Sequence, residues 1–243
     1  MHGFANPARF LRLARWITPL LLVVGGLVSA AALAWGLWRA PADYLQGDSV
    51  RILYLHVPAA WLGMWGWVAI AIASLAELVW RHPLAAIAAR AAAAPGAFFT
   101  ALCLITGSLW GRPAWGTWWV WDGRLTSMLV LLFLYFAYMA LADAAERDGG
   151  GGSRLAAIFG LVGAVNIPII HYSVLWWNSL HQPPSITMGK SAMSGEFLIP
   201  LLVATVGFSC LFGGVILARM RAILADQQAE ARLRRKAMVR DEA

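Results

Sequence analysis

The residues best suited to chemistry in this chain are histidines, because imidazole binds metals and exchanges protons near neutral pH. Five occur, at His2, His56, His82, His171 and His181. The first is terminal and His82 stands beside an arginine and a proline, so we expect both to be solvated bystanders. His56 begins a long apolar run, and His181 precedes two prolines that exclude helix there. His171 lies about one turn inside the end of another apolar run.

A tryptophan-rich stretch separates His56 from His181. It runs from Trp110 to Ser127, reads WGRPAWGTWWVWDGRLTS, and holds five of the chain's 14 tryptophans: Trp110, Trp115, Trp118, Trp119 and Trp121. Three glycines, at positions 111, 116 and 123, and a proline interrupt it, so we expect it to leave the preceding helix as a loop. Large aromatic faces with one acid and two arginines suit a broad, flat, partly charged ligand.

Two histidines on opposite sides of an aromatic floor could supply the axial nitrogens of a haem, whose porphyrin is flat and apolar. His56 and His181 flank the stretch in this way. Guanidinium and ammonium groups could then meet the haem propionates. The candidate cations are Arg51, Arg112, Arg124 and Lys190, and for each of them a contact with lipid headgroups is equally compatible.

Two residues admit other roles. His171 is either a further ligand or, as we favour, a hydrogen-bonding residue within the bundle, where Pro168 frees a backbone carbonyl. Asp122 follows the last tryptophan of the stretch, and we expect its carboxylate mainly to accept backbone N–H bonds at the start of the next helix. A zinc site is the weaker alternative, because zinc needs three or four ligands and the sequence shows no close-spaced pair.

The composition indicates a membrane protein. The 243 residues are 60% hydrophobic and only 13% charged. A membrane-spanning helix needs about 20 mainly apolar residues. We therefore predict an all-α integral membrane protein whose single domain, 1–243, has six transmembrane helices, at about 16–38, 56–80, 84–109, 125–143, 155–175 and 196–218. A tryptophan loop at 110–124 and a basic tail at 219–243 complete the prediction.

Arginine and lysine determine the orientation, because they collect on the cytoplasmic side. With both termini cytoplasmic, 14 of the 19 cations lie inside and 5 outside. Most tryptophans then lie at the outer face, including the whole tryptophan loop. An aromatic belt populates both interfaces, so this one-sided distribution indicates an outer site.

The positive-inside pattern also explains the net charge of +7 without nucleic acid. Cys103 and Cys210 lie inside apolar runs and form no CxxC pair, which argues against dithiol chemistry. The Gly189–Lys190–Ser191 fragment lacks the glycine of a phosphate-binding loop five residues earlier, where Pro184 stands. Any energy from ATP would come from another subunit.

The run from Trp115 to Asp122, WGTWWVWD, resembles the signature of the haem-handling WWD membrane proteins of cytochrome c biogenesis. Within these, the chain is most similar to the CcmC family, through that loop, LYLHVPAAW around His56 and NSLHQPPS around His181. The resemblance covers nearly the whole chain. It implies that His56 and His181 are axial ligands of a transiently bound haem b.

The resemblance further implies that the WWD segment contacts haem and the haem chaperone CcmE. The positions concerned are Trp115, Gly116, Trp118, Trp119, Trp121 and Asp122. The implied task is to hold haem at the periplasmic face of the inner membrane and present it to CcmE, without turnover chemistry. CcmA, CcmB and CcmD would complete an ABC transporter complex that releases the loaded chaperone with ATP.

Two other functions stay open at this point. A haem-containing electron-transfer subunit usually places ligands within helices and often binds two haems across the bilayer, but no histidine pair occurs near the inner face. A small-molecule transporter should show ionisable groups or broken helices near the midplane. The predicted helices hold almost no ionisable groups there.

Overall fold

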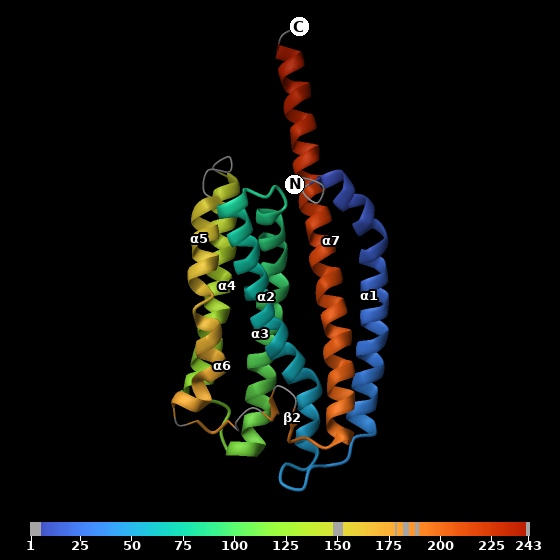
Figure 1. The fold of residues 1–243 in the computed structure, drawn as a ribbon, viewed down its shortest axis with the longest axis vertical. Coiled ribbons are helices and arrows are strands. Elements are labelled where there is room, and N and C mark those ends of the chain that lie inside the picture. Colours follow the sequence, from blue (N-terminus) through green and yellow to red (C-terminus); the bar gives the residue numbers. More distant parts are fainter. Residues whose placement is uncertain (1–5, 148–152, 178, 182–184, 188–189, 242–243) are drawn as a thin grey trace.

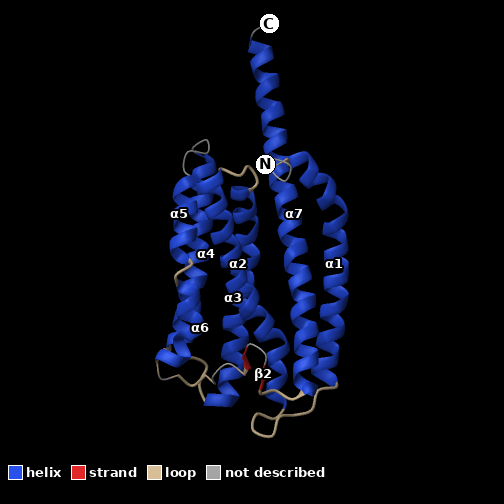
Figure 2. Ribbon diagram, in the orientation of Figure 1, coloured by secondary structure: helices blue, strands red, loops and turns tan. Residues whose placement is uncertain are grey.

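The computed structural model describes residues 6–147, 153–177, 179–181, 185–187 and 190–241. Most of them are helical (Figure 2). In chain order the elements are α1 (Pro7–Trp38), the 3-10 helix η1 (Asp48–Ile52), α2 (Leu53–Trp80), α3 (Ala85–Trp115), α4 (Gly123–Arg147), α5 (Ser153–Gly163), α6 (Asn166–Trp176), the strands β1 (Ile186–Thr187) and β2 (Lys190–Ser191), and α7 (Gly195–Asp241).

Among the described residues, six helical stretches are long and apolar enough to cross a membrane, with α5 and α6 together forming the fifth. The predicted six-helix membrane fold is therefore confirmed. In Figure 1 the start of α1 and the projecting end of α7 lie at one end of the bundle, which we call the terminal end. The α3–α4 connection and the β1–β2 hairpin lie at the opposite end, which we call the site end.

The tryptophan loop is shorter than the predicted range of 110–124. Helix α3 continues through Pro113 to Trp115, and α4 already begins at Gly123, which leaves a connection of residues 116–122. A proline removes only its own N–H from the helical ladder, and one missing bond does not end the last turn. The helix ends at Gly116, whose left-handed φ of 78° and N–H bond to the Arg112 carbonyl form a C-terminal cap.

The fifth span is not the single helix predicted over 155–175. It is interrupted between α5 and α6, because Pro168 has no N–H for the Ala164 carbonyl. That carbonyl instead accepts the N–H of Ile167, at 3.1 Å. The fully buried indole of Trp67 packs against this segment, donating from Nε1 to the Gly160 carbonyl at 3.1 Å. The interruption is thus tightly packed and hydrogen-bonded.

Helix α7 is longer than its predicted span of 196–218. It continues without a break through most of the predicted tail, 219–243, to Asp241. Met220 and Leu224 still pack in the bundle, against Leu84 and Ile87. From residue 225 to residue 238 every described side chain is exposed, and the helix projects beyond the other helices (Figure 1).

Helices α1 and α7 pack side by side, and small residues let their backbones approach (Figure 1). A Cβ placed on Gly25 of α1 would lie 2.5 Å from the backbone nitrogen of Leu211 and 2.9 Å from the carbonyl oxygen of Gly207. The neighbouring Gly26 has open space, since its nearest neighbour atom, in the Leu211 side chain, is 4.0 Å away. Close packing therefore requires glycine at only one of these adjacent positions.

We predict that Gly25→Ala lowers the stability of the protein in detergent by about 1–3 kcal/mol, because the added methyl group forces α1 from α7. Gly26→Ala is the matched control, since it gives the same gain in helix propensity without the clash. Thermal unfolding of the two variants beside the wild type measures the difference. Equal melting temperatures for the two variants would show that α1 and α7 do not approach this closely.

Candidate functional site

His56 lies in the first turns of α2, at the site end, and its ring is held by α3. The Nδ1 atom lies 3.1 Å from the Cys103 carbonyl oxygen and 3.0 Å from the hydroxyl oxygen of Thr106. That hydroxyl donates its own proton to the Leu102 carbonyl, at 2.7 Å. Both neighbours of Nδ1 are thus acceptors, which assigns the proton to Nδ1 and leaves the lone pair on Nε2.

The α3 surface has room for the His56 ring because residue 107 is glycine. A Cβ on Gly107 would lie 3.0 Å from Cε1 of the imidazole. One turn further along α3, the Trp110 indole meets the ring edge-on, with centroids 5.6 Å apart. The indole is itself fixed by a bond from Nε1 to the Gln46 side chain, at 2.7 Å. His56 is therefore held in one orientation by four residues of α3, namely Cys103, Thr106, Gly107 and Trp110.

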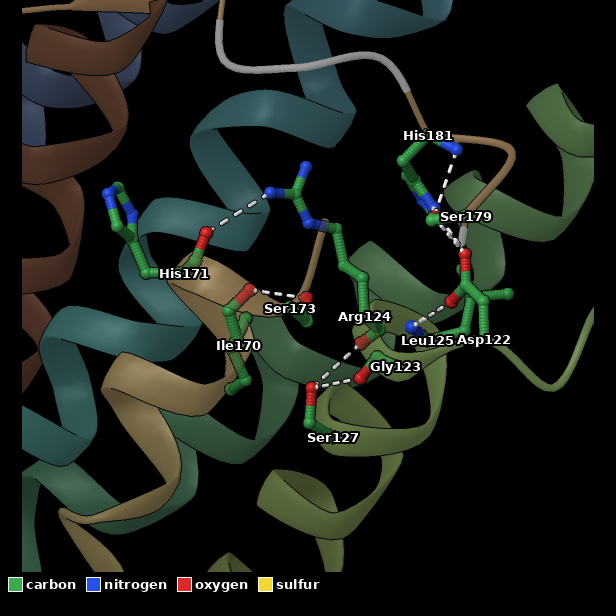
Figure 3. A network of polar contacts seen from close by, with 10 residues as sticks. All are labelled: Asp122, Gly123, Arg124, Leu125, Ser127, Ile170, His171, Ser173, Ser179 and His181. Atoms are coloured by element: carbon green, nitrogen blue, oxygen red, sulfur yellow. Dashed lines mark hydrogen bonds and ion pairs between the residues drawn. The ribbon is translucent and has the colours of Figure 1, made fainter. Parts of the chain in front are cut away.

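Asp122 joins the second histidine to the start of α4 (Figure 3). Its Oδ1 accepts the backbone N–H of Leu125 at 2.8 Å, which is the helix-start bond that we predicted. Its Oδ2 accepts the hydroxyl proton of Ser179 and lies 2.8 Å from Nδ1 of His181. The residue is only 6% exposed. The carboxylate thus connects two segments that lie far apart in the sequence.

His181 takes its position from this carboxylate. A carboxylate accepts hydrogen bonds, so Nδ1 carries the proton and Nε2 is left with the lone pair. The Ser179 hydroxyl oxygen accepts the His181 backbone N–H at 3.1 Å, which fixes the turn as well as the ring. The ring of Trp115 lies against the imidazole, with centroids 4.7 Å apart. An imidazole backed by a carboxylate is the usual arrangement of a metal-binding histidine.

The pKa values of His181 and Asp122 favour a neutral imidazole beside a carboxylate. Burial lowers the pKa of His181, and it outweighs the hydrogen bond and the charge of Asp122, which raise it. Burial raises the pKa of Asp122, but the hydrogen bonds from Ser179, Leu125 and His181 together bring it below its ordinary value. At neutral pH the pair is therefore a carboxylate beside a neutral imidazole, the form of histidine that binds metals.

Arg124 is the cation most closely associated with both histidines. It lies in the first turn of α4, and its charge acts on His56 and on His181. One guanidinium nitrogen donates to the carbonyl oxygen of His171, at 3.4 Å. Figure 3 shows the guanidinium directed toward α6, whereas the His171 ring points away from the Asp122–His181 pair. The His171 ring lies against Tyr172 instead, with centroids 4.8 Å apart.

Arg51 is engaged elsewhere. Its guanidinium donates to the carbonyl oxygens of Leu37 and Ala40, at 2.7 and 3.2 Å, and pairs with Asp48 at 3.1 Å. These contacts join the end of α1 to η1, so the structure gives Arg51 a role in holding that connection. Among the described residues, its hydrogen bonds and ion pair go to Leu37, Ala40 and Asp48, and not to His56 or His181.

The tryptophans that we predicted as one platform divide into two groups. Trp110 and Trp115 contact the histidines, whereas Trp119 and Trp121 lie edge to face, with centroids 5.4 Å apart. This second pair lines a shallow apolar hollow of about 350 Å³, together with Leu104, Ile105, Ser108 and Leu129. Trp118 and Trp121 are 55% and 74% exposed. Trp118 and Trp121 thus present aromatic surface outward.

Four partners of the histidines were missed by the reasoning from sequence, namely Cys103, Thr106, Gly107 and Ser179. Thr106 and Gly107 lie inside an apolar run about 50 residues from His56, and their contact depends on how α2 and α3 pack. Ser179 carried a usable signal, because a serine two residues before a histidine can bond to its backbone N–H. The described residues contain no cluster of three or more His, Cys, Asp or Glu side chains that could hold a metal ion.

We predict that Asp122→Asn moves the pKa of His181 further below its ordinary value of 6.5, because Asp122 raises it in the wild type. The neutral ring should also lose its strong preference for a proton on Nδ1. Nuclear magnetic resonance of the ligand-free protein, with ¹⁵N-labelled histidine, measures both quantities as the pH is varied. Asp48→Asn is the control, since it removes a carboxylate that pairs with Arg51. An upward shift in Asp122→Asn would contradict the assigned contact.

Comparison with known proteins supplies the family. The family described as "Heme exporter protein C" (CcmC) matches residues 1–235. The "Heme exporter protein C" of Bradyrhizobium diazoefficiens is 52% identical over 221 residues, which are 89% of this chain and 82% of that protein. The Escherichia coli K12 protein of the same name is 45% identical, over 92% of this chain and 90% of its own length. A "Putative cytochrome c biosynthesis ccmC-like mitochondrial protein" from Marchantia polymorpha is 41% identical, over 81% of this chain and 83% of its own length. The family predicted from the tryptophan-rich motif is confirmed, and the chain belongs to the heme exporter protein C family.

Proposed function

We propose that this protein handles haem for cytochrome c maturation, binding it at the site end between His56 and His181. The observation that carries the proposal is that both imidazoles hold their proton on Nδ1. Each donates from Nδ1 to a fixed acceptor within 3.1 Å, so each keeps the lone pair of Nε2 for a metal. When bound, haem b would supply the iron that these two nitrogens ligate.

The surrounding residues fit a transiently bound porphyrin. Trp110 and Trp115 place apolar ring edges beside the two imidazoles, and Arg124 supplies a cation near both. A guanidinium has five N–H donors, so Arg124 has donors left for a propionate beyond its bond to His171. We assign Arg124 to this contact, and we give Asp122 the role of positioning His181, because both of its oxygens are already bonded.

The proposal extends to the partners and to the side of the membrane. The site end would face the periplasm of the cell inner membrane, as the 14 cations predicted on the other side indicate. The exposed Trp118 and Trp121 would meet the haem chaperone CcmE, which receives the haem. CcmA, CcmB and CcmD would complete the exporter complex, in which a partner subunit would hydrolyse ATP. This subunit would bind and deliver haem without catalysing a reaction.

The two other functions receive less support from the structure. An electron-transfer subunit with two haems needs ligands at the terminal end, where His82 accepts the backbone N–H of Leu84, at 3.3 Å, within its own turn. A transporter would use the interruption between α5 and α6 as a binding site. That segment is occupied by the indole of Trp67 and by a bond from Asn166 to the Ser127 carbonyl, at 2.9 Å.

The axial assignment predicts that the purified wild-type protein shows a low-spin haem spectrum with two nitrogen ligands. His56→Ala and His181→Ala should each weaken or shift this spectrum, because each removes one ligand. Absorbance of the three proteins, expressed together with CcmE, tests the assignment. His171→Ala is the control, since its ring points away from the Asp122–His181 pair (Figure 3). Unchanged spectra in both test variants would make His171 the candidate ligand, and a wild type without haem would remove the proposed function.

The positioning role of Asp122 predicts about 10–100-fold weaker haem binding in Asp122→Ala, the range that second-layer partners of metal ligands typically contribute. Loading of CcmE should fall with it. Ser179→Ala keeps the carboxylate and should have a smaller effect. Haem titration of the ligand-free proteins measures affinity, and covalent haem on CcmE measures delivery. Normal affinity with defective loading would instead place Asp122 at the chaperone contact.

A further inference from the structure

An apolar groove lies on the side of the bundle, and none of the described residues that line it is a histidine. It has a volume of about 590 Å³ and is formed mainly by α3 and α7, with one residue each from α1 and α2. The lining is made of leucine, valine, alanine, proline and phenylalanine side chains, with a single charged residue, Arg219, at one end. Four phenylalanines contribute, namely Phe98, Phe99, Phe208 and Phe212.

Arg219 is held at the groove by a backbone carbonyl of α3 that lacks its usual helical partner. Pro95 has no N–H, so it cannot bond to the Ala91 carbonyl four residues earlier. The Nε atom of Arg219 donates to that carbonyl instead, at 3.0 Å. This bond crosses from α7 to α3 and uses only one of the five N–H donors of the guanidinium. The guanidinium of Arg219 thus places a fixed positive charge at one end of the apolar groove, the end nearer the terminal end of the bundle.

The α7 wall of the groove is about as long as one leaflet of a bilayer. Its lining residues on α7 run from Phe208 to Arg219, eleven residues apart, which is about 16 Å of helix. The hydrocarbon core of a bilayer is about 30 Å thick, so one leaflet is about 15 Å. An acyl chain that begins at Arg219 and follows this wall to Phe208 would therefore span about one leaflet.

We propose that this groove binds one phospholipid, with an acyl chain along the phenylalanine-lined wall and the phosphate on Arg219. Lateral exposure supports this occupant, since Phe98 is 61% and Val215 37% exposed, so that in a membrane the groove would open to the surrounding lipid. Haem fits less well, because the described lining contains no His, Cys, Met or Tyr to ligate iron. The proposal does not depend on haem binding at the site end.

The test is native mass spectrometry of the full-length protein, released from detergent after titration with phosphatidylglycerol. We expect the wild type to retain one phospholipid, and Arg219→Gln to weaken its binding by about tenfold or more, the loss typical of a charge-assisted hydrogen bond. Arg221→Gln, a variant of another arginine on the same helix, is the control and should bind as the wild type does. Ala94→Phe should also reduce binding, because it fills the groove without altering the charge.

Three results would overturn the proposal. Equal lipid binding by Arg219→Gln and Arg221→Gln would show that Arg219 does not contact the phosphate. Unchanged binding in Ala94→Phe would place the lipid outside the groove. Haem lost from Arg219→Gln, with phospholipid retained, would make the groove a haem site. The thermal unfolding of each variant identifies any that fails to fold, and Arg219→Lys then provides a variant that keeps the cation.

Discussion

The site depends on the hydrogen bonds of one buried carboxylate. A charge that is removed from water must be compensated by hydrogen bonds or by an opposite charge. Asp122 meets this requirement with Leu125 from α4, and with Ser179 and His181 from the connection after α6. The end of the tryptophan loop, the start of α4 and the second histidine are therefore fixed by a single group. Loss of any one partner leaves the carboxylate short of a bond, so these three segments hold one another.

The two histidines reach the same protonation state by different means. His181 has an anionic acceptor behind Nδ1, whereas His56 has a neutral carbonyl and a neutral hydroxyl. A carboxylate makes the imidazole a stronger electron donor than a neutral acceptor does. The helical position of His56 and its packing on Gly107 supply rigidity in place of charge. The site therefore pairs a strongly donating imidazole on a connection with a rigidly held imidazole on a helix.

The sequence predicts the membrane fold well, because length and hydropathy alone identify a spanning helix. It also singles out His56, His181 and Asp122, since their residue types stand out among apolar neighbours. The sequence does not predict the helix ends and side-chain contacts that depend on tertiary packing. Pro113 looks like a helix breaker but removes one bond in a last turn, and Pro168 interrupts a span where Trp67 can fill the space. Thr106 acts on a histidine 50 residues away, through the packing of α2 on α3.

Helix α7 spans 47 residues, about 70 Å, without interruption. It begins directly after the hairpin that follows His181, crosses the bundle, and ends far outside it at the terminal end (Figure 1). Its close packing against α1 at Gly25 and Gly207 makes the two helices one stiff unit. The projecting end of α7 is therefore joined, through one rigid helix, to the segment that leads back to His181. A displacement at the terminal end of the bundle would thus reach the site end through a single continuous element of the chain.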